Sequence, residues 1–332
     1  MKRRLALVTT RTLAIYGFAG WVYIAVVALV EPDTLSWQLT HFAPYPREDT
    51  FGEACFAISL ISYFIYSLLR SSQGKDLGGQ VILRTVINAN IRLSQATNRL
   101  LNRPVGGDPL WGQFNVEADD LIRSLPDGST VLDLGGGRNC AYAKAVEPPG
   151  RVRLVAVDIS AEELAANTDV AETCVADVAA EIPMPDGSAD VILSCTLLEH
   201  VDGVASAVLQ MGRVIRTGGV TMHLVPGRYS LFGMAATVLP FGPLLRLQHA
   251  LRPESKGVVE FPVIYDDCWP QALERDFRQA GFSQVDTRII WRQTDYFEPV
   301  YPLFLLSLIY ERIIALLNLR KFAAYTVVRA VR

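Results

Sequence analysis

The segment that most constrains this chain is the glycine-rich stretch at residues 131–140, which reads VLDLGGGRNC. A short apolar run with a β-branched residue ends at Asp133 and Leu134, three glycines follow, and the next residues are compatible with a helix. This order is typical of the first strand-to-helix turn of a nucleotide-cofactor fold, where missing side chains let the backbone approach a ligand closely. By itself, the segment also fits a tight turn that binds nothing.

Three later segments favour the cofactor interpretation. Residues 153–158 form another short buried-type strand that ends in Asp158, where a carboxylate can accept hydrogen bonds from both ribose hydroxyls of an adenosine. A third predicted strand ends in Asp177, which we expect near the adenine amino group. A fourth, at residues 190–194, leads into the segment CTLLEHV. Because packing alone does not require an acid at several strand ends, the sequence predicts a ligand site at one edge of a parallel sheet.

The rest of the chain continues the alternation of strands and helices. The pattern predicts a helix over 205–216 that stops at Gly218 and Gly219, then a strand over 220–225. A further helix is predicted over 266–280, and two strands over 284–290 and 323–332.

With these motifs, the chain resembles the class I S-adenosylmethionine-dependent methyltransferases, and in particular their type 11 methyltransferase domain. Asp133, Gly135 and Gly137 match the family's glycine-rich motif, while Asn139 stands where a third glycine is common. Asn tolerates unusual backbone angles, so this departure is mild. The resemblance implies an α/β fold over residues 119–332, with a Rossmann-like sheet, helices on both faces and a closing antiparallel strand pair.

The resemblance also implies a set of site residues. S-adenosylmethionine is expected as cofactor, bound by Asp133, Gly135, Gly136, Gly137, Asn139, Asp158, Ile159, Asp177, Val178 and Ser194. His200 is the candidate general base for an oxygen acceptor, although a role in the local turn is the alternative. Glu199 is left open between a helix terminus and the pocket, and Asp190 is expected to be structural.

The N-terminal part of the chain predicts a membrane anchor. Half of all residues are hydrophobic, and the excess is concentrated in residues 13–30, long enough for about one bilayer crossing, and in the shorter run 54–69. Basic residues precede the first run and follow the second, whereas the loop between them is acidic. The positive-inside rule therefore predicts a hairpin of two transmembrane helices within 1–75, with both ends in the cytoplasm.

Two other interpretations of this region stay open. A cleaved signal peptide fits the basic start and apolar middle of residues 1–30, but no clear cleavage site follows. A buried soluble helical hairpin is compatible with the shortness of residues 54–69. Residues 76–118 are expected to form a helical linker or cap.

Two apolar insertions interrupt the predicted domain, at residues 226–262 and 299–320. Apolar residues flanked by cations suit a segment lying at a membrane surface, and a lid over the active site is the alternative. The adjacent charges Glu311 and Arg312 make a spanning helix less favourable than an interfacial or docked one.

Composition excludes several other classes of function. The five cysteines form no CxxC pair, and their odd number gives no complete disulfide framework. The four histidines are scattered, so no metal site is expected. The net charge of −3 lacks the basic excess that is typical of nucleic-acid-binding proteins.

Together these patterns predict an enzyme in the cytoplasmic membrane, with its catalytic domain facing the cytoplasm, that methylates a lipid or lipid-linked acceptor. Methylation of a quinone precursor or of a soluble small molecule is the alternative within the enzyme class. A non-catalytic membrane scaffold that binds S-adenosylmethionine is the alternative from another class.

Overall fold

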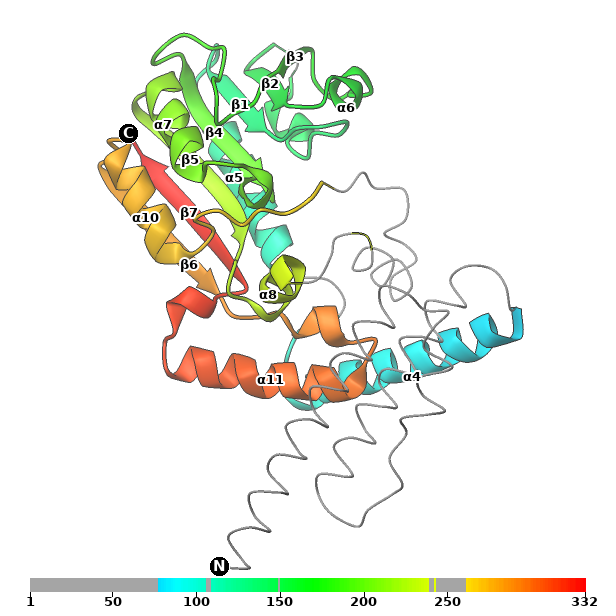
Figure 1. Ribbon diagram of the computed structural model, residues 1–332. Helices are drawn as coiled ribbons and strands as arrows, with labels where there is room; N and C mark the ends of the chain where they lie inside the picture. Colours follow the sequence, from blue (N-terminus) through cyan, green and yellow to red (C-terminus); the bar gives the residue numbers. More distant parts are fainter. Residues whose placement is uncertain (1–76, 106–108, 149, 239–241, 243–260) are drawn as a thin grey trace, which may run out of the picture. The chain divides into compact units, whose positions relative to one another are not determined.

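A computed structural model describes residues 77–105, 109–148, 150–238, 242 and 261–332 (Figure 1). The chain divides into two compact units, of which the first comprises Met1–Asn90 and Leu239–Val259. The second unit, Ile91–Val238 with Glu260–Arg332, contains the sheet and all the contacts described below.

The second unit is built on one seven-stranded sheet with the strand order β3-β2-β1-β4-β5-β7-β6. The strands are β1 (Thr130–Leu134), β2 (Arg153–Asp158), β3 (Glu172–Val175), β4 (Ala189–Cys195), β5 (Ile215–Pro226), β6 (Gln284–Ile290) and β7 (Tyr325–Val331). The first five are parallel, and β7 lies between β5 and β6, antiparallel to both. The carboxyl ends of β1 to β4 therefore share one edge of the sheet.

Seven α-helices accompany the sheet in the described part of the chain. They are α4 (Leu77–Leu100), α5 (Pro109–Arg123), α6 (Ala161–Ala165), α7 (Val204–Val214), α8 (Leu231–Val238), α10 (Pro270–Gln279) and α11 (Tyr301–Leu316). Helix α11 is inserted between β6 and β7, and α8 follows β5.

Both faces of the sheet are covered because successive strand residues point to opposite sides. Leu132 and Leu134 of β1 belong to a buried cluster with residues of α7 and α10. Val131, on the same strand, belongs to a second cluster with residues of α5, including Phe114. The expected Rossmann-like sheet with helices on both faces is confirmed. The predicted domain start at residue 119 falls inside α5.

Most of the predicted strands are confirmed. Strands β2 and β6 have the predicted bounds, and β4 extends the predicted run by one residue at each end. The closing antiparallel pair is formed by β6 and β7, with Ile290 opposite Tyr325. The predicted third strand ends two residues early, since β3 stops at Val175 and leaves Asp177 in the following loop.

The prediction that Gly218 ends a helix is wrong. Helix α7 ends at Val214, and its C-cap residue Ile215 already has extended backbone angles. Strand β5 begins there and pairs Ile215 with Ala189, before a register irregularity. Gly218, with φ +77°, lies inside this irregular start of β5 and donates its N–H to the Arg332 carbonyl. The glycine thus marks a local break in a strand.

The predicted helix over 266–280 begins four residues late. Helix α10 starts at Pro270, whose ring fixes φ without sacrificing an internal hydrogen bond at this position. Tyr265 and Asp267 both have positive φ, which is incompatible with a right-handed helix. The predicted terminator is confirmed, since Gly281 follows the helix with φ +88°.

The predicted transmembrane hairpin, residues 13–30 and 54–69, lies outside the described residues. Within the described ranges, no helix has both the length and the apolar character to cross a bilayer. The described part of the insertion 226–262 contains α8, and the insertion 299–320 contains α11.

Candidate active site

The glycine-rich turn packs tightly against the end of β2. Gly135 and Gly136 both direct their N–H groups to the Val157 carbonyl, at 2.7 and 3.3 Å. A Cβ atom added at Gly136 would lie 2.8 Å from the Cβ of Ala156, closer than real side chains approach. Gly135 and Gly137 have φ values of +75° and +39°. The turn therefore needs glycine for two separate reasons, close packing and backbone conformation.

Asp158 joins this turn to the end of β2. Its Oδ2 accepts a hydrogen bond from the Gly137 N–H at 3.1 Å, and its Oδ1 accepts one from the Ser160 N–H at 2.8 Å. The carboxylate is half-buried, and the next side chain, Ile159, is 64% exposed. A polar acceptor beside an exposed apolar side chain is the pair of features that an adenosine requires, one for the ribose and one for a base face.

Asp133 lies beneath the turn. It is 5% exposed, and its Oδ2 would lie 3.2 Å from a Cβ added at Gly136. The pKa of Asp133 is raised to about 7, first by burial, while a hydrogen bond with Cys140 lowers it and the charge of Asp158 raises it. Its side chain supports the turn from inside the sheet.

Two further residues, which sequence reasoning missed, form hydrogen bonds with the backbone of the glycine-rich segment. The Asn167 side-chain amide donates to the Gly137 carbonyl at 2.8 Å and to the Gly136 carbonyl at 3.4 Å. Asp169 accepts from the Cys140 N–H at 2.9 Å. These residues lie some thirty positions from the turn, and no local spacing signals the contact. Asn139, the departure from the glycine motif, is exposed beside them.

The adenine-side candidates differ in exposure. Asp177 is exposed, and its Oδ1 accepts a hydrogen bond from the Ala179 N–H at 2.9 Å. Val178 is buried in the core on the α7 side of the sheet. Asp177 is therefore the accessible one of the two side chains.

Ser194 points into the protein. It is fully buried, and its Oγ lies 2.7 Å from His223 Nδ1, while Thr221 bonds the other ring nitrogen of the same histidine. Burial lowers the pKa of His223 to about 3, so the ring is neutral. This Ser-His-Thr cluster connects β4 to β5 inside the core, where the hydroxyl of Ser194 is already engaged.

The segment after β4 contacts the turn through Leu197 and then carries Glu199 and His200. Leu197 lies against Gly135, 3.1 Å from a Cβ that would be added there, and the short helix η3 (Leu198–His200) follows directly. His200 has a half-buried side chain whose Nδ1 bonds the Pro262 carbonyl at 3.0 Å. Its Nε2 lies 3.7 Å from Glu199 Oε1.

Glu199 is the most perturbed acid of this segment. It is 4% exposed, and burial raises its pKa to about 8, so the carboxyl is largely protonated at neutral pH. Its Oε2 has no hydrogen-bond partner among the described residues. Its backbone carbonyl accepts from the N–H groups of Ile264 and Tyr265. Perturbed carboxyls of this kind cluster at functional sites, which makes Glu199 a candidate that the motifs had left open.

The thiols and Asp190 have simpler roles. Burial raises the pKa of Cys195 to about 12, so the thiol beside Glu199 stays protonated. Asp190 accepts from the Thr130 N–H at 2.7 Å and from Arg216 at 2.6 Å. The predicted structural role of Asp190 agrees with these contacts.

Comparison with known proteins identifies the type of domain that carries this site. Residues 132–222 match the family described as Methyltransferase domain. A demethylmenaquinone methyltransferase of Beutenbergia cavernae is 29% identical over 211 residues, which cover 58% of this chain and 82% of the relative. A trans-aconitate 2-methyltransferase of an Azoarcus species is 29% identical over 176 residues, 51% of this chain and 67% of the relative.

Solved structures are similar at lower identity. Phosphoethanolamine N-methyltransferase 2 of Haemonchus contortus, in complex with S-adenosyl-L-methionine, is 15% identical with a TM-score of 0.42. The aligned region covers 67% of this chain and about half, 52%, of that one.

The matched domain and the two relatives define the class of this protein, an S-adenosylmethionine-dependent methyltransferase with S-adenosylmethionine as cofactor. The structure fits that cofactor. The matched range includes the glycine turn, where a Cβ at Gly136 would be blocked, and the half-buried Asp158 beside exposed Ile159. Those residues, with exposed Asp177, are the ones that would hold it.

Proposed function

We propose that the chain is a membrane-associated methyltransferase that transfers the methyl group to a lipid or lipid-linked acceptor on the cytoplasmic side of the membrane. The observation that carries the membrane part is the apolar run at residues 13–30, with basic residues before it, in the same chain as the methyltransferase domain. Enzyme and anchor on one polypeptide keep the site close to acceptors that reside in a bilayer.

The bound cofactor supplies an electrophilic sulfonium methyl group, so the chain's own residues must align the acceptor and handle a proton. The glycine turn and Asp158 fix the adenosine end of the cofactor, which orients the reacting end. After β4, His200 is the candidate base for an acceptor hydroxyl: its Nδ1 donates to the Pro262 carbonyl, which leaves Nε2 as the nitrogen that can accept a proton. The hydrogen bond to the Pro262 carbonyl holds the imidazole, and the protonated Glu199 carboxyl lies 3.7 Å from Nε2.

The names of the relatives correspond to the two alternatives within the enzyme class, a quinone precursor and a soluble small molecule. One relative acts on demethylmenaquinone and the other on trans-aconitate, by their names. A quinone precursor would fit the proposed membrane association. With a soluble acid as acceptor, the anchor would only locate the enzyme at the membrane and would play no part in access to the acceptor. A scaffold that binds cofactor without transferring its methyl group is the alternative outside the enzyme class.

Methyl transfer from radiolabelled cofactor to a total lipid extract tests the proposal. The full chain in vesicles should label the organic phase, and Asp158→Ala should lose most of that label because it weakens cofactor binding. Label confined to water-soluble acceptors would overturn the lipid assignment. Cofactor binding without transfer to either phase would favour the scaffold.

A further inference from the structure

Helix α11 is apolar on its solvent side as well as on its buried side. Its buried side carries Ser307 and Glu311 among Phe304, Leu308 and Ile314. Its solvent side carries large apolar residues instead, with exposed fractions of 37% for Leu305, 63% for Leu306, 57% for Ile309, 49% for Ile313 and 86% for Leu316. These positions recur at helical spacing and therefore form one face.

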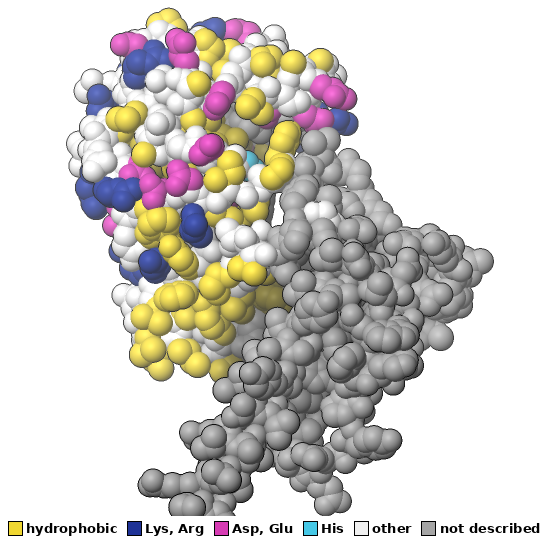
Figure 2. All heavy atoms as spheres, viewed as in Figure 1, with side chains coloured by type: hydrophobic (Ala, Val, Ile, Leu, Met, Phe, Trp, Pro, Cys, Tyr) yellow, Lys and Arg dark blue, Asp and Glu magenta, His cyan; other side chains and the backbone are white. Residues whose placement is uncertain are grey.

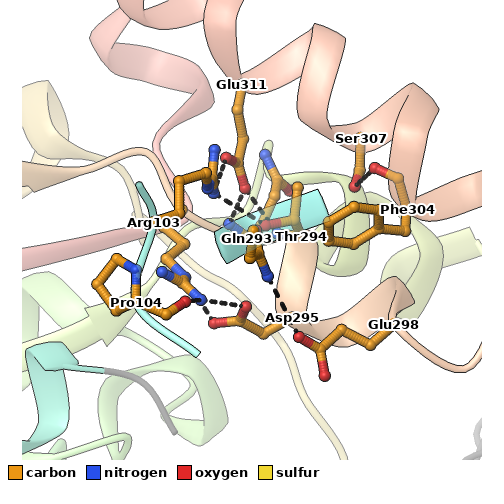
Figure 3. Close-up of polar contacts among 11 residues, drawn as sticks. Arg103, Pro104, Gln293, Thr294, Asp295, Glu298, Phe304, Ser307 and Glu311 are labelled. Carbon is orange, nitrogen blue, oxygen red and sulfur yellow. Dashed lines mark hydrogen bonds and ion pairs between the residues drawn. The ribbon is translucent and has the colours of Figure 1, made fainter. Parts of the chain in front are cut away.

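Buried polar contacts fix the orientation of this helix (Figure 3). Glu311 is 3% exposed and forms an ion pair with Arg103 at 2.7 Å. Its Oε1 also accepts hydrogen bonds from the backbone N–H groups of Gln293 and Thr294. Arg103 donates as well to Thr294 Oγ1 at 3.0 Å. A carboxylate with three donors holds one side of α11 inward, so the opposite side must face outward.

A second helix end lies beside α11. Ser94 and Thr97 of α4 bond to the Glu298 carbonyl and to the Tyr301 hydroxyl, at 3.2 and 2.9 Å. Leu100, at the end of α4, is 82% exposed. Figure 2 shows hydrophobic side chains gathered over the region of α11.

The exposed charges on α11 and on the end of α4 indicate what kind of partner the apolar face of α11 contacts. The sequence of α11 contains one acid, the buried Glu311, and residues 91–100 of α4 contain none. The exposed charges of these two segments are all positive, on Arg92, Arg99 and Arg312. The chain as a whole has more acids than bases, 34 against 31, so the absence of exposed acids from these two segments is a local property. Apolar side chains with cations and no carboxylate match the boundary of an anionic lipid bilayer.

A second copy of the chain fits this face less well. In a twofold interface, the same patch contacts itself, so Arg312 of both copies would lie at one largely apolar interface. The face offers no carboxylate to pair with either guanidinium. In a bilayer the arginine stem instead lies along apolar side chains while its head reaches the phosphates.

We propose that the outer face of α11, formed by Leu305, Leu306, Ile309, Arg312, Ile313 and Leu316, lies in the headgroup region of an anionic membrane. This inference rests on the proposed membrane association but not on the acceptor or on turnover. It adds a second contact, made by the catalytic unit itself, which sets the orientation of the active site to the bilayer.

Site-specific photocrosslinking tests this contact in the full chain. p-Benzoylphenylalanine replaces Leu306 or Ile309, and the protein is bound to vesicles of phosphatidylglycerol and phosphatidylcholine with a radiolabelled acyl chain. Leu209, 54% exposed on α7, is the control position. We expect several-fold more lipid label at residues 306 and 309 than at residue 209.

The other crosslinking products would contradict the lipid contact. Crosslinked dimers would show that a second copy of the chain occupies the face, and crosslinks within one chain would show that another segment covers it. Vesicle-bound protein that crosslinks no lipid at either position would overturn the contact while leaving the membrane anchor intact. Protein that does not sediment with vesicles would overturn the proposed membrane association instead.

A charge variant tests the choice of an anionic surface. Arg312→Gln should lower lipid crosslinking from residue 309 on anionic vesicles several-fold, and the difference should shrink on neutral vesicles. Arg278→Gln, at an exposed arginine of α10, is the matched control. Equal losses for both variants would show a general effect of net charge and overturn the local role of Arg312.

Discussion

Asp158 connects two segments of the active site that are separate in the sequence. Its two carboxylate oxygens accept hydrogen bonds from the backbone of Gly137 and of Ser160, so the glycine turn and the loop after β2 share one acceptor. Prediction from the sequence placed this residue at the ribose because a strand ended there. The structure adds a second role, since the same carboxylate holds the turn.

Asp158→Ala should therefore weaken cofactor binding by about 1.5–3 kcal/mol, the range for hydrogen bonds to a charged group. Titration calorimetry with S-adenosylmethionine measures the loss. Asp177→Ala should cost less, because that exposed side chain contributes only at the adenine edge. If both variants bind the cofactor as the parent does, the assignment of these acids is wrong.

The glycine turn gives a second test. In Gly136→Ala, the new Cβ would approach the Cβ of Ala156 to 2.8 Å and the Asp133 carbonyl oxygen to 3.1 Å, so stability should fall by about 1–3 kcal/mol. Urea unfolding measures the change. Gly112→Ala in α5 is the control, since nothing in the described structure lies within 4 Å of its added Cβ. That control should gain about 0.5–1 kcal/mol.

Glu199 predicts a pH dependence of stability. Its pKa in the folded chain is about 8, above the ordinary 4.5, so folding favours the protonated carboxyl. The associated stability is fully present below pH 4.5 and is lost as the pH rises through about 8. Glu199→Gln mimics the protonated acid and should remove this loss. In urea unfolding, the free energy of unfolding of the variant should rise relative to that of the parent between pH 6 and pH 9.

Asp133, whose pKa is also raised, is present in both proteins, so its contribution cancels from that difference. A difference that stays constant between pH 6 and pH 9 would show that Glu199 titrates normally. The same variant also bears on catalysis. If Glu199 positions His200, the pH profile of methyl transfer should shift, whereas a purely structural role would change stability alone.

At the scale of elements, the sequence predicted what is local. The strands β2 and β6 were correct in both bounds, because short apolar or alternating runs between turn residues define a strand by themselves. Gly218 misled the prediction because a glycine with positive φ serves a strand irregularity as well as a helix end. Only pairing with β4 distinguishes the two, and such pairing is a non-local property.

The packing of α11 at Glu311 also depends on a non-local contact that the sequence does not reveal. The sequence places Glu311 beside Arg312 and predicts a helix that does not span a bilayer. It does not reveal that Glu311 is buried while Arg312 is exposed. The partner that turns Glu311 inward is Arg103, 208 residues earlier in the chain. Asn167 and Asp169 contact the glycine turn from 29 to 31 residues away, so motif reasoning missed them as well.

Glu311→Ala should destabilise the second unit by about 3–5 kcal/mol, because it leaves Arg103, whose side chain is only 14% exposed, without its counter-ion. The backbone N–H groups of Gln293 and Thr294 lose their acceptor as well. Chemical denaturation measures the effect. Arg312→Ala, one residue away but exposed, should change stability by no more than about 0.5 kcal/mol. Similar losses from both substitutions would mean that the buried contacts do not hold the helix.

At the scale of the whole molecule, the catalytic elements and the outward apolar face belong to one packed unit. Helix α11 begins after β6 and ends before β7, and those two strands pair with each other in the sheet. Both ends of the helix are therefore tied to the sheet that carries the cofactor turn. A surface contact made by α11 would fix how the active site faces a bilayer, independently of any N-terminal anchor.

Deletion of residues 1–70 separates these two contributions. The sheet and its buried clusters begin well after that point, so the fragment should fold and bind S-adenosylmethionine with the affinity of the full chain. It should methylate a lipid acceptor poorly, since the proposed anchor is gone. Residual binding to anionic liposomes should persist through the outer face of α11, and Leu306→Glu together with Ile309→Glu should abolish it.

Two measurements on this fragment, cofactor titration and liposome sedimentation, distinguish the possible outcomes. A fragment that cannot fold would show that the N-terminal segment packs into the catalytic unit. A fragment that folds, ignores liposomes and methylates a water-soluble acceptor at the full rate would contradict both the lipid acceptor and the α11 contact. Residual liposome binding that the two glutamates remove would instead assign that affinity to α11, because these substitutions leave the buried side of the helix and its Glu311 contacts unchanged.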